Sequence, residues 1–344
     1  MKLWKKVDCL LIGNFHDCWK DPLISKYLGE EAAKSFEGIL IISRNEKALW
    51  ISHPFNYTQA KKKFKNKIKV LTYHSIKDLK KILTKNTGKF IGYNSKHQTV
   101  KSFNSLKQFL RGKKFIDVEL ELSEIRENKN SFEIENIRCA TRETKKVINL
   151  AKKWVKKGIT EKQLEEKIKK QIIRDGFDVA FCIVAFDENT THIHHVATNK
   201  KLSFGPVMID LGAKFNGYCA DLTETFFFGE NNTNTKHSKK LKEFIKTKKL
   251  VQKVVNKIES ILKPGQKSKE LWKASKILGK AKHALGHGIG LEVHDYPQKI
   301  DEKTNFILKE GMVLAIEPAL YNKKFGVRIE NDYLITKKGF EKLE

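Results

Sequence analysis

The sequence predicts an α+β protein of two domains, with residues 1–122 forming a smaller α/β domain and residues 123–344 a larger mixed one. Three observations support this expectation. The chain has 344 residues, which is more than one hydrophobic core usually organises. Its first third alternates short apolar runs with lysine-rich stretches of helical spacing, whereas strand patterns dominate from Phe181 onward. The polar segment Asn128–Ser131 interrupts the pattern near the expected boundary.

Short apolar runs bounded by polar residues indicate the strands of the first domain. Near the N-terminus, lysines precede an apolar stretch, but Asp8 and Asn14 interrupt it and no small-residue cleavage site follows. We therefore expect a first strand there and not a signal peptide. The other elements expected are a hairpin of Gly38–Ser43 and Ala48–Ser52 joined by Arg44–Lys47, strands at Ile68–Leu71 and Lys89–Tyr93, and a helix at Ser75–Leu83.

Capping signals predict where the helices of the second domain begin. Asn130 or Ser131 can cap a helix that has Glu133 in its first turn. The segment Thr160–Ile173 opens with TEKQ, the spacing of a capping box, and is expected to be the second helix. A third helix is expected roughly over Ser238–Leu262, because the Pro-Gly pair that follows stops it.

Composition narrows the possible partners and the compartment. The net charge is +28, but only seven of the 68 basic residues are arginines, the side chain better suited to bidentate phosphate and base contacts. We read the charge as a lysine-coated surface and expect no specific nucleic-acid partner. No apolar run is long enough to span a bilayer, so no membrane insertion is expected. The five cysteines include no CxxC pair, which favours reduced thiols and a cytoplasmic location.

Two aspartates are expected to meet across a hairpin in the second domain. The elements expected are a strand Val207–Ile209 ending in Asp210, a turn at Gly212–Gly217 and a returning strand Tyr218–Phe228. In that arrangement Asp221 shares a strand face with Cys219 and lies across from Asp210. Two carboxylates held together in apolar surroundings are costly unless a cation lies between them.

Further side chains that commonly bind metals occur later in the chain. VLAIEP places Glu317 after an apolar strand, and GVRIEND places Glu330 on another, with Arg328 two residues earlier on the same face. The glycine-rich segment GHGIGLEVHD carries His287 and His294. Each residue alone has an ordinary structural explanation. Together, two Asp, two Glu and one His suit Mn²⁺, Co²⁺, Fe²⁺ or Zn²⁺ and can hold two such ions with a water between them.

The order Asp210, Asp221, HGxGLxxHD, IEP and RxE resembles the pita-bread metallopeptidase family, which contains methionine aminopeptidase, aminopeptidase P, prolidase and creatinase. The resemblance covers roughly residues 130–344, and the first third is similar to the creatinase-type N-terminal domain in size and strand-helix pattern. It implies a pita-bread catalytic domain over residues 123–344 behind a creatinase-like domain over residues 1–122. A domain of that length in front favours the Xaa-Pro peptidase branch, and with it we expect a homodimer.

The resemblance also implies a role for each metal-type residue. Asp210 would ligate one of two divalent ions, expected to be Mn, Co or Zn. Asp221 and Glu330 would bridge both ions, and His287 would bind the second one together with Glu317. Glu317 is also the candidate to carry a proton from the attacking water to the leaving imino nitrogen.

Other residues match positions that contact the substrate in the family. His194 would steady the substrate and the tetrahedral intermediate, in preference to its neighbour His195. His294 would contact the region of the scissile carbonyl. His283 and Arg328 would line or support the substrate pocket.

The resemblance therefore implies hydrolysis of Xaa-Pro bonds at the N-terminus of dipeptides or short peptides. The alternatives are a catalytically silent pita-bread paralogue that binds protein or nucleic acid, and creatinase-type C–N hydrolysis on the same fold. The chain departs from the family pattern at three sites: Glu224 replaces an arginine, Phe186-Asp187 replace a small Ser-Gly pair, and Gln298 replaces the arginine suited to a dipeptide carboxylate. The last departure predicts weak selection for dipeptides, since an amide does not replace a bidentate Arg–carboxylate pair.

Overall fold

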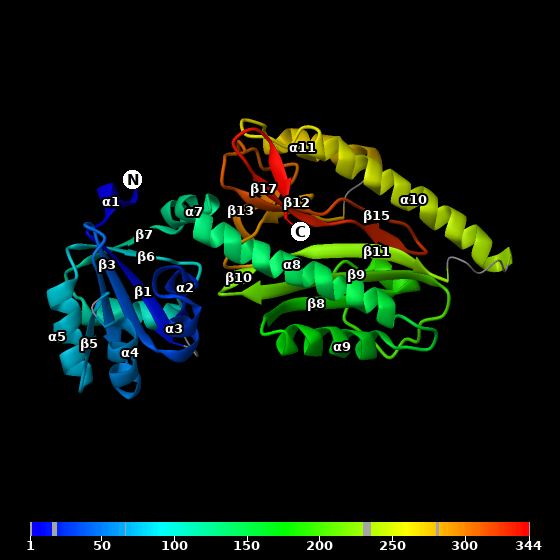
Figure 1. Ribbon diagram of the computed structural model, residues 1–344. Coiled ribbons are helices and arrows are strands. Elements are labelled where there is room, and N and C mark those ends of the chain that lie inside the picture. The colour runs from blue at the N-terminus through cyan, green and yellow to red at the C-terminus, as the bar shows by residue number, and fades with distance from the viewer. Residues whose placement is uncertain (1, 16–18, 66, 230–234, 280–281, 344) are drawn as a thin grey trace. The chain divides into compact units, whose positions relative to one another are not determined.

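The computed structural model of the chain describes residues 2–15, 19–65, 67–229, 235–279 and 282–343 (Figure 1). The chain forms two compact units, Met1–Ile125 and Arg126–Glu344, each with hydrophobic clusters of its own. The division lies within helix α7 (Glu119–Glu127), three residues after the boundary expected from the sequence. Among the helices described, none combines the length and apolar character needed to cross a membrane.

The N-terminal unit is a mixed β-sheet with helices on it. Its elements are α1 (Leu3–Lys6), β1 (Cys9–Phe15), β2 (Trp19–Lys20), α2 (Leu23–Leu28), α3 (Glu30–Ser35), β3 (Gly38–Ser43), β4 (Ala48–Ser52), η1 (Pro54–Asn56), α4 (Tyr57–Phe64), β5 (Lys69–Thr72), α5 (Ile76–Asn86), β6 (Phe90–Tyr93), α6 (Val100–Phe109) and β7 (Lys114–Asp117). The strand order is β5-β4-β3-β1-β6-β7, with β2 paired to β1. The expected hairpin of β3 and β4 is confirmed, and Ser75 caps α5.

Both faces of this sheet are buried, as the alternation along its central strands shows. Leu10 and Leu40 belong to one apolar cluster, whereas their neighbours Leu11 and Ile41 belong to the cluster on the opposite face. Consecutive strand residues point to opposite faces, so near-continuous apolar runs are what a sheet covered on both sides requires.

In the residues that the structure describes, the C-terminal unit contains three sheets and four longer helices. Its elements are α8 (Ser131–Trp154), α9 (Glu161–Arg174), β8 (Asp178–Phe186), η2 (Asp187–Thr191), β9 (Gly205–Phe215), β10 (Tyr218–Cys219), β11 (Leu222–Phe228), α10 (Thr235–Glu259), α11 (Ser268–Ser275), η3 (Lys276–Leu278), β12 (Gly286–Gly288), β13 (Asp295–Ile300), β14 (Val313–Ile316), β15 (Ala319–Tyr321), β16 (Gly326–Arg328), β17 (Asn331–Ile335) and β18 (Phe340–Lys342).

Helices cover the outer face of each larger sheet of this unit. The first sheet joins β10, β9 and β11, with β8 paired to β9, and apolar residues of α8 and α9 pack on it. The second has the order β13-β12-β14-β17-β18, and α10 and α11 pack on it (Figure 1). The strands β15 and β16 form a short separate ladder.

The capping signals predicted two helix starts correctly. Asn130 caps α8 and forms a capping box with Glu133, and Thr160 forms one with Gln163 at α9. The third helix differs from its expected bounds of Ser238–Leu262. Its last residue is Glu259, because the amides of residues 261 and 262 bond three residues back and not four.

The bounds expected for the strand that carries Asp210, and for the turn after it, are wrong. The strand that carries Asp210 does not end there but runs to Phe215, and the turn is confined to Asn216 and Gly217, which have φ of 48° and 89°. Gly212 lies inside the strand, where a Cβ would come 2.4 Å from the carbonyl oxygen of Ala220. Its glycine therefore reflects close packing and not a turn.

Both returning segments are broken where a single strand was expected. The chain leaves the ladder between β10 and β11 at Asp221, whose amide donates to a carboxylate oxygen of Asp332 at 3.1 Å. A second break separates β16 from β17, so that Arg328 and Glu330 do not share one strand. At that break the amide of Glu330 donates to the carbonyl of Thr223. Asp221 and Glu330 therefore lie outside the strands, where side-chain direction need not alternate from one residue to the next.

Candidate metal centre

A cavity of about 310 Å³ in the C-terminal unit gathers most of the residues singled out from the sequence. The five expected metal ligands, both expected catalytic histidines and Arg328 line it, together with three apolar side chains. The full lining is Phe181, Ile183, His194, Asp210, Asp221, His287, Val293, His294, Glu317, Arg328 and Glu330. His283 lies outside this lining but contacts Glu317, which belongs to it.

Three of these residues converge most closely. Single ligand atoms of Asp221, His287 and Glu330 all lie within 4.8 Å of one another, and all three residues are buried. The Nε2 atom of His287 is 3.6 Å from Oδ2 of Asp221. Asp221 comes from the break before β11, His287 from the middle of β12 and Glu330 from the break before β17.

The electrostatics of the cavity favour a cation. Burial, and then the neighbouring carboxylates, raise the pKa of Asp221 and of Glu330 well above their ordinary values. Burial, followed by the nearby His294, lowers the pKa of His287 to about 4, which leaves its imidazole neutral and able to bind a metal. One carboxylate oxygen of Asp210 and one of Asp221 are buried without a hydrogen-bond partner in the described part of the chain. Unpaired buried acceptors facing repelling carboxylates fit divalent cations.

Arg328 connects the first of these carboxylates to the wall of the cavity. This fully buried guanidinium donates through Nη2 to Asp210, and through Nε to the hydroxyl of Thr223 at 3.0 Å. That hydroxyl in turn donates to Oε2 of Glu330 at 2.5 Å. The pKa of Arg328 is raised, because the attraction of Asp210 and its other partners outweighs its burial. One arginine therefore orients carboxylates from two different elements.

Tyr321, which the sequence analysis did not single out, joins two of the residues that it did. Its hydroxyl lies 3.0 Å from Nη1 of Arg328 and 3.0 Å from Nε2 of His283. The Nδ1 atom of His283 is 3.3 Å from Oε2 of Glu317. Burial, and then Arg328, lower the pKa of His283 to about 4. A tyrosine four residues after Glu317 carries no sequence signal of its own.

Asp332 is a second residue that the sequence analysis missed. It is fully buried, and its Oδ2 accepts from the amide of Asp221 at 3.1 Å and from the hydroxyl of Thr141 at 3.0 Å. Burial raises the pKa of Asp332 to about 7. A carboxylate directly before the apolar residues Tyr333–Ile335 of strand β17 was the available signal, since such a group requires partners when buried.

The two expected catalytic histidines come from irregular segments. The ring of His294 lies 4.3 Å from that of His287, centroid to centroid. Its neighbour Asp295 is buried, accepts from the amide of Leu291 and pairs with the buried guanidinium of Arg126 at 3.0 Å. His194 lies in the irregular segment between η2 and β9.

Two of the departures from the family pattern lie outside the cavity lining. Glu224 pairs with Lys152 of α8 at 2.5 Å, whereas its neighbours Thr223 and Thr225 contact the site. Asp187 has a φ of 52° and pairs with Lys240 at 2.6 Å. The side chain of Gln298 lies outside the described residues. The charge reversal at position 224 therefore changes a contact between β11 and α8.

Comparisons with known proteins agree with this geometry. The sequence model described as Metallopeptidase family M24 matches residues 135–337, and that of the Creatinase/Prolidase N-terminal domain matches residues 27–128. An Xaa-Pro dipeptidase of Pyrococcus furiosus is 30% identical over 317 residues, covering 89% of this chain and 86% of that protein. An uncharacterised peptidase of Staphylococcus epidermidis is 33% identical over 258 residues, covering 72% of this chain and 71% of that protein. The crystal structure of an X-Pro aminopeptidase from Thermotoga maritima superimposes with a TM-score of 0.86 at 28% identity, over 98% of this chain and 95% of that one.

Proposed function

Because this chain belongs to metallopeptidase family M24, we propose that it is a dinuclear metallopeptidase that hydrolyses Xaa-Pro bonds at the N-terminus of dipeptides and short peptides. The observation that carries the proposal is the convergence of two aspartates, two glutamates and a histidine on one cavity. The names of the Pyrococcus and Thermotoga relatives support the choice of Xaa-Pro substrates.

The residues that would hold two divalent ions are Asp210, Asp221, His287, Glu317 and Glu330, all of which line the cavity. Bound ions would polarise the scissile carbonyl and lower the pKa of a water towards neutrality. The mixture of carboxylates with one imidazole suits Mn²⁺, Co²⁺ or Zn²⁺. Arg328 and Thr223 would keep Asp210 and Glu330 oriented through the hydrogen bonds described above.

The remaining side chains of the cavity suit the other demands of peptide hydrolysis. His194 and His294 can donate hydrogen bonds to the carbonyl oxygen as it gains negative charge. Glu317 can accept the proton of the attacking water and deliver it to the imino nitrogen of the leaving proline. The apolar part of the lining, formed by Phe181, Ile183 and Val293, offers a surface for a proline ring.

The same observation argues against a catalytically silent binding protein. Keeping several carboxylates buried beside one another costs free energy, and a binding module has no need of that arrangement. Creatinase-type C–N hydrolysis is disfavoured for the same reason, because that reaction usually dispenses with the metals.

The test combines metal content with activity. Protein reconstituted with Mn²⁺, Co²⁺ or Zn²⁺ and freed of excess ion should retain about two ions per chain and hydrolyse Xaa-Pro and Xaa-Pro-Yaa peptides. Peptides with alanine in place of proline serve as the substrate control. Absence of bound metal after reconstitution would favour the silent paralogue.

A homodimer, a cytoplasmic location and the lack of a specific nucleic-acid partner are proposed on sequence grounds alone. The family resemblance supports the first, and the cysteine and arginine content supports the others. Sedimentation velocity tests the dimer. Binding to unrelated DNA duplexes at rising salt tests specificity, since purely electrostatic adhesion fades uniformly with ionic strength.

A further inference from the structure

The segment that carries His194 is irregular and partly exposed. We call residues 187–200 the His194 segment. After η2 it contains no further helix or strand, and its Val196 is 80% exposed. Such a segment would be expected to sample many conformations unless polar contacts restrain it. The side chain of His194 nevertheless lines the cavity.

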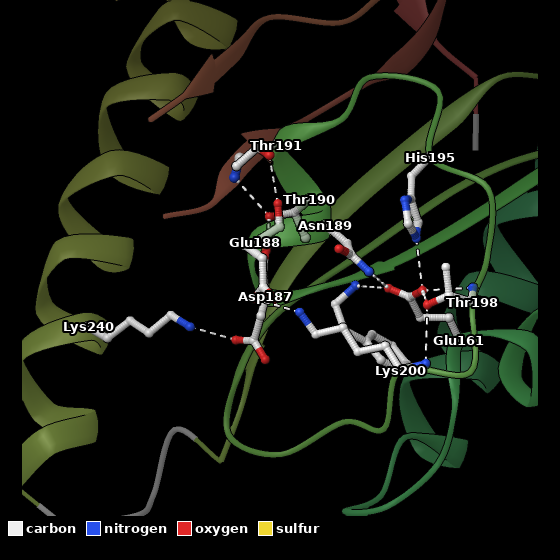
Figure 2. A network of polar contacts seen from close by, with 12 residues as sticks. Glu161, Asp187, Glu188, Asn189, Thr190, Thr191, His195, Thr198, Lys200 and Lys240 are labelled. Carbon is white, nitrogen blue, oxygen red and sulfur yellow. Dashed lines mark hydrogen bonds and ion pairs between the residues drawn. The ribbon is translucent and has the colours of Figure 1, made fainter. Parts of the chain in front are cut away.

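A single buried carboxylate, that of Glu161, accepts several of the hydrogen bonds that restrain the segment (Figure 2). Glu161, the first residue of α9, is 0% exposed. Its Oε1 accepts from the amide of Phe186 at 2.8 Å and from Nδ2 of Asn189 at 2.9 Å. Its Oε2 lies 2.8 Å from Nε2 of His195, and accepts from the amide of Thr198 at 2.9 Å and from its hydroxyl at 2.6 Å.

These contacts favour an ionised Glu161 and a proton on Nε2 of His195. Burial alone would raise the pKa of Glu161, but hydrogen bonds from Thr198, His195 and Asn189 hold it below its ordinary value. The carboxylate also lies at the N-terminus of α9, where the helix dipole favours negative charge. An ionised carboxylate only accepts hydrogen bonds, so Nε2 of His195 must carry a proton.

The same segment is also hydrogen-bonded to strand β16. The hydroxyl of Thr190 accepts from the amide of Gly326 in β16 at 2.8 Å. The carbonyl of Ile193 lies 3.5 Å from Nη1 of Arg328. His194 thus lies directly between a residue bonded to the cavity arginine and the residue bonded to Glu161.

We infer that Glu161 and His195 form a positioning pair that restrains the His194 segment and thereby sets where the His194 imidazole lies in the cavity. The inference rests on the proposed function, in which His194 contacts the reacting carbonyl. Catalytic groups displaced by about 1 Å can lose a factor of about 100 in rate, so a restraint one residue away is enough to matter. His195, which the sequence analysis ranked below His194, would act through His194 and not on the substrate.

Kinetics of a double-mutant cycle test whether His195 acts through His194. His195→Ala should lower kcat for Xaa-Pro peptides by about 10–100-fold with a small change in KM, since positioning affects the transition state more than substrate binding. His195→Gln, which keeps a donor towards Glu161, should recover part of the loss. In a His194→Ala background, His195→Ala should have little further effect. Losses that multiply in the double variant would overturn the inference.

Hydrogen exchange tests the restraint without using activity. In His195→Ala, and in the second variant Thr198→Val, amide exchange across the His194 segment should be at least about tenfold faster than in the wild type. Val196→Ala, an exposed neighbour in the same segment, is the matched control for both measurements and should change neither. Unchanged exchange in both test variants would refute the restraint. If the wild type did not hydrolyse Xaa-Pro peptides, the proposed function would fail, while exchange would still decide whether Glu161 and His195 hold the segment.

Discussion

The substitution Asp221→Asn should have opposite effects on stability with and without metal. Asp221 is buried next to Glu330 and His287, with ligand atoms within 4.8 Å of one another. Without a cation, its charge is a source of repulsion; with one, it is expected to be a bridging ligand. Asparagine keeps the shape and leaves the backbone hydrogen bond to Asp332 in place, but removes the charge.

The size of the effect without metal follows from the geometry. Two carboxylate charges no more than 4.8 Å apart repel by about 3 kcal/mol or more at an effective dielectric constant of about 20. Proton uptake relieves part of this, because burial and mutual repulsion raise the pKa of both groups. We therefore expect the metal-free variant to be more stable by about 1–2 kcal/mol, or about 2–8 °C in the melting temperature of the C-terminal unit.

The effect with metal has the opposite sign. A ligand that binds only the folded state at 100 times its dissociation constant contributes about 2.7 kcal/mol, which raises the melting temperature of a unit of this size by about 5–11 °C for each ion. The wild type should gain this stabilisation. The variant should lose most of it, and with it the hydrolysis of Xaa-Pro substrates.

Differential scanning calorimetry with chelator and with Mn²⁺ measures both effects on the same transition. Glu302→Gln, which removes one exposed acidic charge from the same unit, is the control and should follow the wild type in both conditions. The reasoning would be refuted by a variant that is less stable without metal yet fully stabilised by Mn²⁺, since Asp221 would then belong to a packing network and not to a cation site.

Four further outcomes are expected. Thr223→Val removes the hydroxyl that donates to Glu330, and isothermal titration calorimetry should find metal affinity weaker by about 10–100-fold; unchanged affinity would show that Glu330 needs no orienting partner. Peroxide should inactivate the wild type and Cys219→Ala at equal rates, because Cys219 is packed in an apolar cluster; a clearly slower loss in the variant would mean that this thiol reaches the site. Gln298→Arg should raise kcat/KM for Xaa-Pro dipeptides over tripeptides by about 1–3 kcal/mol, and strong rejection of tripeptides by the wild type would contradict the premise. The wild type should be more stable than Glu161→Gln, with the full difference present above pH about 4.5. The difference should shrink as pH falls through the lowered pKa of Glu161, and thermal unfolding from pH 7 to 3 measures it. A difference that does not change with pH would mean that the charge of Glu161 does not contribute to stability.

The sequence by itself determined several helix starts, one hairpin and the identity of the metal-type residues, because these depend on local chemistry. An N-cap at Asn130 or Ser131 and a capping box at Thr160 predicted two helix starts, because such caps satisfy amides within four residues of one another. The hairpin of β3 and β4 was equally predictable, since short apolar runs and the short turn between them are local properties. The metal-type donors were identified by residue type and order, because divalent cations select carboxylates and imidazole.

Tertiary structure alone decided how those donors meet. Strand alternation predicted continuous strands through Asp221 and Glu330, but long-range hydrogen bonds to Asp332 and Thr223 interrupt both ladders and turn the carboxylates into the cavity. Tyr321 has no local signature, because its role depends on two partners brought near it by other elements. A buried polar group must find its partners wherever the chain brings them, so contacts between residues far apart in sequence could not be predicted from spacing.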